Sequence, residues 1–246
     1  QTTLLPPSRA RDAVDGALAA HPGSYVVTDV ALDPAPDRVI RLPDLHSVPA
    51  DCASEVTVDP ESIVAIGFTS GSTGQPKANA KSWRNFDVGS RLNAAVLAPF
   101  LGLAEGVSAN IVATVPAQHM YGMEMAVLLP LFGAYSVHSS RPFFAADIAA
   151  ALTEVPEPRI LVSTPVHLRN LLAEPVSLPP LAAIICATAP LGAELATHIE
   201  ARCSAPLIEL FGSTETCVIA HRRTAREADW RLHAGVCLQP QPDGTL

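Results

Sequence analysis

The chain of 246 residues has few lysines, few charged residues and no long apolar stretch. Only 16% of its residues are charged, its formal net charge is −8, and its two lysines are Lys77 and Lys81. Because a nucleic-acid-binding domain is normally basic, this balance argues against nucleic acid as a partner. The longest apolar runs, 94–104 and 125–135, are far shorter than the ~20 residues of a membrane-spanning helix, so we expect no membrane span. The hydrophobic content of 48% excludes an intrinsically disordered chain.

The cysteines and histidines show no spacing that indicates a disulfide framework or a zinc site. The five cysteines are odd in number and contain no Cys-x-x-Cys pair. The eight histidines contain no His-x-x-x-His pair. Reduced thiols are the better interpretation, and we therefore expect a cytoplasmic protein.

From Ile63 onward, short β-branched runs alternate with helix-like stretches. This alternation predicts an α/β fold of layered, largely parallel sheets with flanking helices, and antiparallel strands near the C-terminal end. Thr164 and Pro165 are typical of an N-cap and first helical position. Strands are expected at 63–68, 111–115, 134–138, 160–163, 181–186 and 207–210, and helices at 82–97, 121–131, 165–172 and 194–202.

Composition divides the chain into three parts. Residues 1–60 are rich in proline and aspartate and are expected to form part of a first lobe and its connection. Residues 61–219 are expected to form the α/β core. Residues 220–246 show shorter polar-apolar alternation with a Pro-Asp-Gly turn, which predicts the start of an antiparallel β subdomain. Since the chain begins with Gln1 and ends near this turn, we expect a piece of a longer protein.

A glycine-rich loop follows the first predicted core strand. Its residues are Thr69, Ser70, Gly71, Ser72, Thr73, Gly74, Gln75, Pro76 and Lys77. The glycines allow close approach of the backbone to a ligand, successive N–H groups can bind an anion, and lysine adds positive charge. The loop is neither a P-loop, since Pro76 stands where that motif has glycine, nor a Gly-x-Gly-x-x-Gly fingerprint. The loop therefore predicts a site for phosphates. Lys81, four residues after Lys77, is either a second phosphate contact or a solvated residue at a helix start.

The segment from Thr69 to Lys77 resembles the signature of the adenylate-forming superfamily, the AMP-binding acyl and aryl acid ligases. Three later segments are similar to further motifs of this family, in the expected order: Pro116–Gly122, Ala187–Leu191 and Phe211–Glu215. The chain departs from the family pattern at Ala78, where glycine is usual, and at Phe211, where tyrosine is common. The resemblance implies that residues 61–219 form an AMP-binding core. It implies adenylation of a small carboxylic acid by ATP, with release of pyrophosphate, followed by transfer to a thiol.

The resemblance also implies a role for each motif residue. Thr69, Ser70, Gly71, Ser72, Thr73, Gly74 and Lys77 would bind the outer phosphates of ATP. The adenine would be bordered by Ala187, Thr188, Ala189 and Pro190, and Phe211 would stack on it. The adjoining Gly212 and Ser213 would also bind the nucleotide. Thr214 would donate to the α-phosphate, and Glu215 would bind Mg²⁺. His119, Met120, Tyr121 and Gly122 would line the acid pocket. Lys77, His119, Thr214 and Glu215 are the candidate catalytic residues.

Segments 118–122, 128–131 and 141–144 resemble the ligases of aryl-polyene and xanthomonadin pigment clusters. That resemblance implies transfer of an aromatic acid, such as a hydroxybenzoate, to the phosphopantetheine of an acyl carrier protein. A fatty-acyl or aryl ligase that uses coenzyme A is one alternative, and a catalytically silent AMP-binding module is another. The small C-terminal lid domain of the family, with its catalytic lysine, is expected to be absent. The chain alone should therefore adenylate poorly.

Overall fold

The computed structural model describes residues 15–16, 18–19, 26–28, 37–41, 57–69, 77–102 and 108–239. The chain divides into two units. The first comprises residues up to Ile66 together with Ala80–Trp83, and the second comprises Gly67–Asn79 and Arg84–Leu246. In the first unit, β1 (Val26–Thr28) and β2 (Val39–Arg41) pair in parallel.

Strands β3 (Ile63–Thr69) and β4 (Lys77–Ser82) form a two-stranded sheet on either side of the glycine-rich loop. The strand expected before this loop is confirmed. Strand β4 is not among the predicted elements, because its six residues include no β-branched or aromatic side chain. Lys81 lies in β4 and is only 5% exposed, so the second of its two alternatives, a solvated lysine at a helix start, is wrong.

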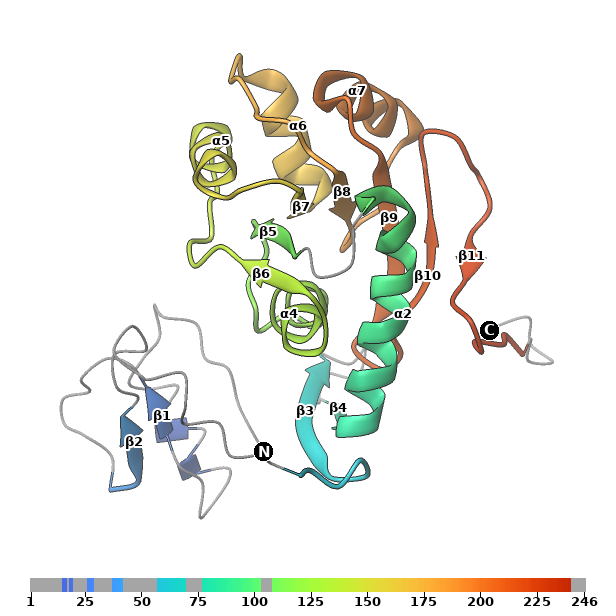
Figure 1. Cartoon of the computed structure of the whole chain (residues 1–246). Coiled ribbons are helices and arrows are strands. Elements are labelled where there is room, and N and C mark those ends of the chain that lie inside the picture. The colour runs from blue at the N-terminus through green and yellow to red at the C-terminus, as the bar shows by residue number, and fades with distance from the viewer. Residues whose placement is uncertain are drawn as a thin grey trace. The chain divides into compact units, whose positions relative to one another are not determined.

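The second unit is built on a sheet that holds seven of the described strands, in the order β11-β10-β9-β8-β7-β5-β6 (Figure 1). Neighbouring strands are parallel from β6 to β9, so the predicted, largely parallel α/β architecture is confirmed. The bounds are β5 (Ala109–Ala113), β6 (Tyr135–Val137), β7 (Arg159–Ser163), β8 (Ala183–Cys186), β9 (Leu207–Ser213), β10 (Cys217–Arg222) and β11 (Arg231–Leu232).

Antiparallel pairing begins at β10, which folds back on β9, and continues with β11. We expected this pairing from residue 220 onward, but β10 already begins at Cys217. The two antiparallel strands extend the edge of the main sheet, because a three-residue turn returns the chain directly alongside β9. The domain boundaries stay predictions.

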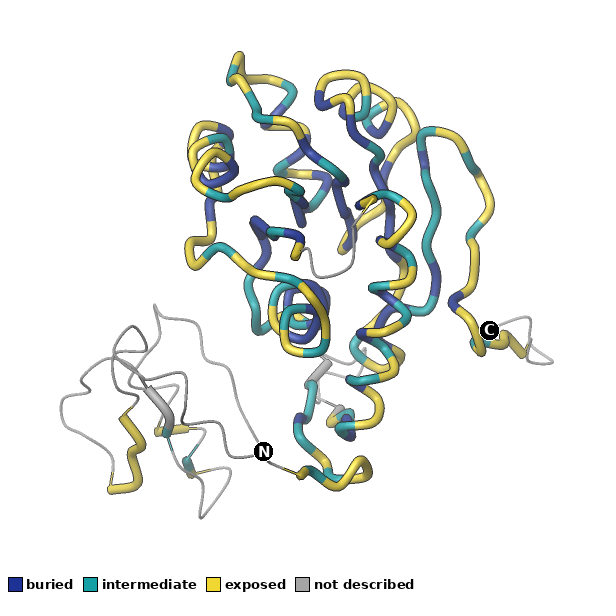
Figure 2. The backbone as a smooth tube through the Cα atoms, viewed as in Figure 1, coloured by how far each residue is buried: buried dark blue, intermediate teal, exposed yellow. Residues whose placement is uncertain are grey.

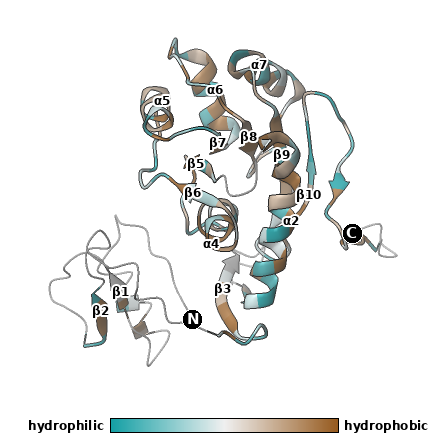
Figure 3. Ribbon diagram, in the orientation of Figure 1, coloured by the Kyte–Doolittle hydropathy of each residue, from teal (hydrophilic) through white to brown (hydrophobic). Residues whose placement is uncertain are grey.

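The helices that cover this sheet are α2 (Trp83–Leu101), α3 (Met120–Met123), the π-helical η4 (Glu124–Leu128), α4 (Leu129–Phe132), α5 (Ala145–Glu154), α6 (Pro165–Ala173) and α7 (Ala193–Cys203). They lie on both of its faces (Figures 1 and 2), and successive side chains of a strand point to opposite faces. Ile160 and Val162 of β7 pack in one cluster with α2 and the α3–α4 segment, whereas Leu161 packs with α5, α6 and α7. The central strands are accordingly apolar on both faces (Figure 3).

Two helices differ in detail from their predicted form. The stretch expected as one helix at 121–131 contains the π-helical segment η4, a feature that is frequent at functional sites. Thr164 and Pro165 begin α6 as predicted, but the Thr164 hydroxyl bonds Nδ1 of His167 at 2.8 Å instead of capping a backbone N–H. Among the described helices, none is both long and apolar enough to cross a membrane.

Candidate active site

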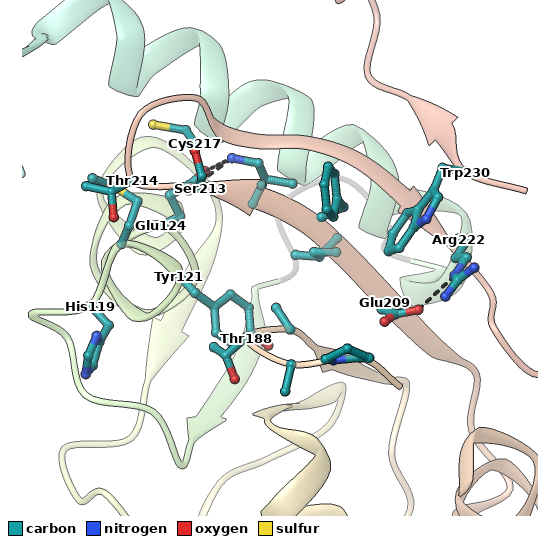
Figure 4. A pocket seen from close by; sticks show the side chains of 18 residues that line it. His119, Tyr121, Glu124, Thr188, Glu209, Ser213, Thr214, Cys217, Arg222 and Trp230 are labelled. Atoms are coloured by element: carbon teal, nitrogen blue, oxygen red, sulfur yellow. Dashed lines mark hydrogen bonds and ion pairs between the residues drawn. The ribbon is translucent and has the colours of Figure 1, made fainter. Parts of the chain in front are cut away.

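A cavity of about 450 Å³ opens at the carboxyl ends of β8 and β9 in the second unit (Figure 4). This edge of a parallel sheet is where α/β folds bind ligands, and the volume is typical of small-molecule sites. The lining residues are His119, Met120, Tyr121, Glu124, Ala187, Thr188, Ala189, Pro190, Glu209, Leu210, Phe211, Gly212, Ser213, Thr214, Cys217, Val218, Arg222 and Trp230.

Three of the four predicted motifs meet in this cavity. They come from the start of α3, from the turn after β8 and from the end of β9, three places far apart in the sequence. The predicted residues that they contribute are His119, Met120, Tyr121, Ala187, Thr188, Ala189, Pro190, Phe211, Gly212, Ser213 and Thr214.

Two predicted residues of these motifs do not line the cavity. Gly122 packs against the backbone of Pro116, whose carbonyl oxygen would collide with any side chain at position 122. Glu215 lies exposed in the turn between β9 and β10, where its N–H donates to Oγ of Ser213 at 3.2 Å. Gly122 therefore has a packing reason for being glycine, and the magnesium role of Glu215 stays a prediction.

The glycine-rich loop is described only at its two ends. Thr69 ends β3 and Lys77 begins β4, whereas Ser70, Gly71, Ser72, Thr73 and Gly74 lie outside the described residues. Near the end of β3, a Cβ on Gly67 would lie 2.6 Å from Cγ2 of Thr214 and 3.4 Å from Cε of Met120. Gly67 therefore lies directly against two residues of the cavity.

The side chain of Tyr121 lines the cavity, but its hydroxyl is already used within the protein. It donates to the carbonyl oxygens of Ser163 at 3.1 Å and Ile185 at 3.0 Å, at the ends of β7 and β8. Burial raises the pKa of Tyr121 well above 10, so the phenol is neutral. This residue fixes the start of α3 on the sheet and offers mainly its ring to a ligand.

Two lining residues with side chains adopt the left-handed backbone region. Thr188 has φ 81° and Cys217 has φ 61°. Such values are unusual for non-glycine residues, and strain of this kind concentrates at ligand-binding sites. The strain lies in the turn after β8 and at the start of β10, two of the segments that border the cavity.

Glu124 is a buried carboxylate that the sequence did not single out. It is 4% exposed and accepts hydrogen bonds from Nδ2 of Asn93 at 3.1 Å and from the N–H of Val218 at 3.2 Å. These bonds join α2, η4 and β10. Glu124 therefore holds β10 in place directly after the Ser213–Cys217 turn. In the sequence, the only sign of this role is that Glu124 is a single acidic residue within the apolar helix expected at 121–131, because glutamate is almost never buried without partners.

Glu209 is a second buried carboxylate, also 4% exposed. One oxygen accepts from the N–H of Leu191 at 3.1 Å, and the other accepts from Nε of Arg222 at 2.8 Å and Oγ1 of Thr224 at 2.6 Å. Because Leu191 directly follows the Ala187–Pro190 turn, Glu209 ties that turn to β9 and β10. Its signal in the sequence was a charged residue inside the apolar strand at 207–210.

Comparison with known proteins confirms the predicted family. A model of the AMP-binding enzyme family matches residues 8–241, almost the whole chain. The chain belongs to the AMP-binding enzyme family. Within it, the chain is 30% identical over 200 residues to a 4-coumarate–CoA ligase of Rhodobacter capsulatus, a match that covers 81% of this chain and 47% of the relative. The chain thus spans about half the length of that relative.

Solved structures also share the fold of this chain. A benzoate CoA ligase from Burkholderia xenovorans LB400 matches 74% of this chain and 37% of its own, with a TM-score of 0.59 and 22% identity. ATP-bound MatB from Rhodopseudomonas palustris matches 70% of this chain and 33% of its own, with a TM-score of 0.56 and 22% identity. The finer resemblance to aryl-polyene and xanthomonadin ligases stays a prediction.

Proposed function

We propose that this family member activates a carboxylic acid with ATP, forming an acyl adenylate and pyrophosphate, and then transfers the acyl group to a thiol. The observation that carries the proposal is the meeting of three predicted motifs in one cavity at the carboxyl ends of β8 and β9. Membership of the AMP-binding enzyme family supports the same chemistry. In the first step the carboxylate oxygen attacks the α-phosphorus, and the bond to pyrophosphate breaks.

The difficulty of this step is the approach of an anion to a polyanion. Two unit charges ~4 Å apart repel by about 4 kcal/mol at an effective dielectric constant of ~20. The protein must therefore supply positive charge and alignment more than a nucleophile of its own. We assign Lys77 and the glycine-rich loop to the outer phosphates, Thr214 to the α-phosphate and His119 to the substrate carboxylate.

The adenine has two candidate walls in the cavity. Phe211, at the end of β9, is 53% exposed, and the backbone of Ala187–Pro190 lines the same cavity from the turn after β8. A large aromatic side chain left exposed at a cavity is suited to stacking on a base. We assign the purine to the space between these two segments.

Magnesium fits this site only if phosphate oxygens of the bound nucleotide supply part of its coordination shell. The described residues contain no group of three or more His, Cys, Asp or Glu side chains that could hold a metal by themselves. Mg²⁺ is commonly bound by one or two carboxylates, with phosphate oxygens and water completing its shell, and it neutralises phosphate charge. We assign the protein carboxylate to Glu215, which is exposed in the turn after β9.

We propose an aromatic acid as substrate and coenzyme A as acceptor, because a relative at 30% identity is a 4-coumarate–CoA ligase. An acyl carrier protein is the second candidate acceptor, on the resemblance of segments 118–122, 128–131 and 141–144 to pigment-cluster ligases. A fatty acid as substrate and a silent nucleotide-binding module are the remaining alternatives.

Pyrophosphate exchange by the complete gene product tests the proposal. We expect Mg²⁺-dependent exchange with 4-coumarate, benzoate or a hydroxybenzoate and little with fatty acids, followed by product formation with coenzyme A or a carrier protein. Glu215→Ala should abolish exchange, whereas Glu154→Ala, which removes an exposed carboxylate of α5 outside the cavity, should not. ATP binding without exchange for any acid would favour the silent module.

A further inference from the structure

Strands β9 and β10, together with the residue that precedes β11, place Glu209, Arg222 and Trp230 in one row beside Phe211. The register pairs Glu209 of β9 with Arg222 of β10, and His221 of β10 with Arg231 of β11. The next position of that register places Trp230 beside Arg222. Because Glu209 and Phe211 are two residues apart on one strand, they share a face.

The side chains of this row are in contact from one end to the other. Arg222 donates from Nε to Glu209 at 2.8 Å and from Nη1 to the carbonyl oxygen of Ala228 at 2.8 Å. Its guanidinium carbon lies 4.3 Å from the centroid of the Trp230 ring. The Trp230 and Phe211 rings are 5.2 Å apart and inclined by 47°. All four side chains line the cavity (Figure 4).

We propose that Trp230, held by Arg222 that Glu209 fixes in turn, packs against one side of the Phe211 ring and keeps it in place, so that the free face of Phe211 forms a fixed stacking platform for the purine base of ATP. Trp230 and Arg222 are thus positioning residues for base recognition, an inference that rests on the proposed function. An exposed phenylalanine would otherwise have to be ordered when the base binds, and such ordering weakens binding. Glu209 also holds the N–H of Leu191, so the same carboxylate sets the position of the platform relative to the Ala187–Pro190 turn.

Nucleotide binding by substituted forms of the complete gene product tests this inference. Trp230→Ala should weaken binding of ATP and AMP roughly 10-fold, the effect expected for losing an aromatic contact and the order it imposes. Binding of inorganic pyrophosphate should be unchanged, because pyrophosphate has no base. In the exchange reaction the KM for ATP should rise while kcat and the KM for the acid change little. Trp230→Phe should restore most of the affinity.

Arg222→Met should weaken ATP binding in the same direction, since the guanidinium no longer holds Trp230. Its matched control is Arg223→Met, which removes an arginine that pairs with Glu200 at 2.7 Å and does not line the cavity. This control should lower the thermal stability similarly and leave ATP binding unchanged.

Equal weakening of ATP and pyrophosphate binding in Trp230→Ala would overturn the inference, because it would indicate general damage to the site. Unchanged ATP binding in a folded Trp230→Ala protein would also overturn it, while normal exchange in that protein would leave the proposed function intact. Absence of ATP binding by the unsubstituted protein would overturn both.

Discussion

The buried carboxylate of Glu124 should contribute strongly to stability, because it is the acceptor for two groups with little access to water. Asn93 is 2% exposed and its Nδ2 donates to Glu124 at 3.1 Å, while the N–H of Val218 donates at 3.2 Å. Glu124→Ala leaves both donors unsatisfied at about 1–3 kcal/mol each, partly offset because a charge no longer has to be buried. We expect a loss of about 3 kcal/mol in the free energy of unfolding, and a smaller loss for Glu124→Gln, which keeps one acceptor oxygen.

Urea unfolding of the single and double variants of Glu124 and Asn93 measures this effect. The double-mutant cycle with Asn93→Ala should give a coupling energy of about 1–2 kcal/mol, as expected for a hydrogen bond to a charged group. Glu154→Ala is the control, since its exposed carboxylate is replaced at little cost. A change for Glu124→Ala within about 0.5 kcal/mol of the control, the range of surface substitutions, would refute the reasoning.

Three further predictions concern the close contact at Gly67, the titration of His233 and the hydrogen bonds of Tyr121. Gly67→Ala places a Cβ 2.6 Å from Cγ2 of Thr214, so we expect a loss of about 1–3 kcal/mol in the free energy of unfolding and slower pyrophosphate exchange. Adding Thr214→Ser should relieve both effects, because it removes that methyl group. Absence of rescue would contradict the contact. Burial, and then a neighbouring histidine, lowers the pKa of His233 from 6.5 to about 4, so protonation favours the unfolded chain. The free energy of unfolding should therefore be highest above pH 6.5 and fall by up to about 3 kcal/mol as the pH is lowered towards 4. In His233→Phe the free energy of unfolding should decline less steeply over the same pH range. Tyr121→Phe removes the one hydroxyl hydrogen that the carbonyl oxygens of Ser163 and Ile185 share. It should reduce stability by about 1–2 kcal/mol with an unchanged KM for the acid, whereas a raised KM at unchanged stability would indicate that the hydroxyl binds substrate.

The regular elements of the core could be predicted because their signals are local. Apolar strands such as β7 and β8 and the helix that begins at Thr164-Pro165 stand out within a few residues. Strand β4 could not, because its polar residues form a strand only through pairing with β3. The π-helical segment at Glu124–Leu128 was likewise hidden, since its apolar periodicity is that of an ordinary helix.

The candidate site divides in the same way. Family motifs identified the segments at His119, Ala187–Pro190 and Phe211–Thr214, because each is a contiguous run of characteristic residues. Glu209 and Trp230 belong to no such run. Their importance follows from hydrogen bonds and ring contacts between β9, β10 and the chain before β11, which exist only once these strands are aligned.

The amino-acid pattern alone was sufficient for the α/β class, for the order of the core elements and for the family, since each depends on short-range periodicity or on contiguous motifs. The meeting of those motifs in one cavity, and the carboxylates that hold its walls, depend on the folded chain. Glu124 and Val218 illustrate the reason: their hydrogen bond joins residues 94 positions apart, and no local pattern specifies which distant donor a buried carboxylate will meet.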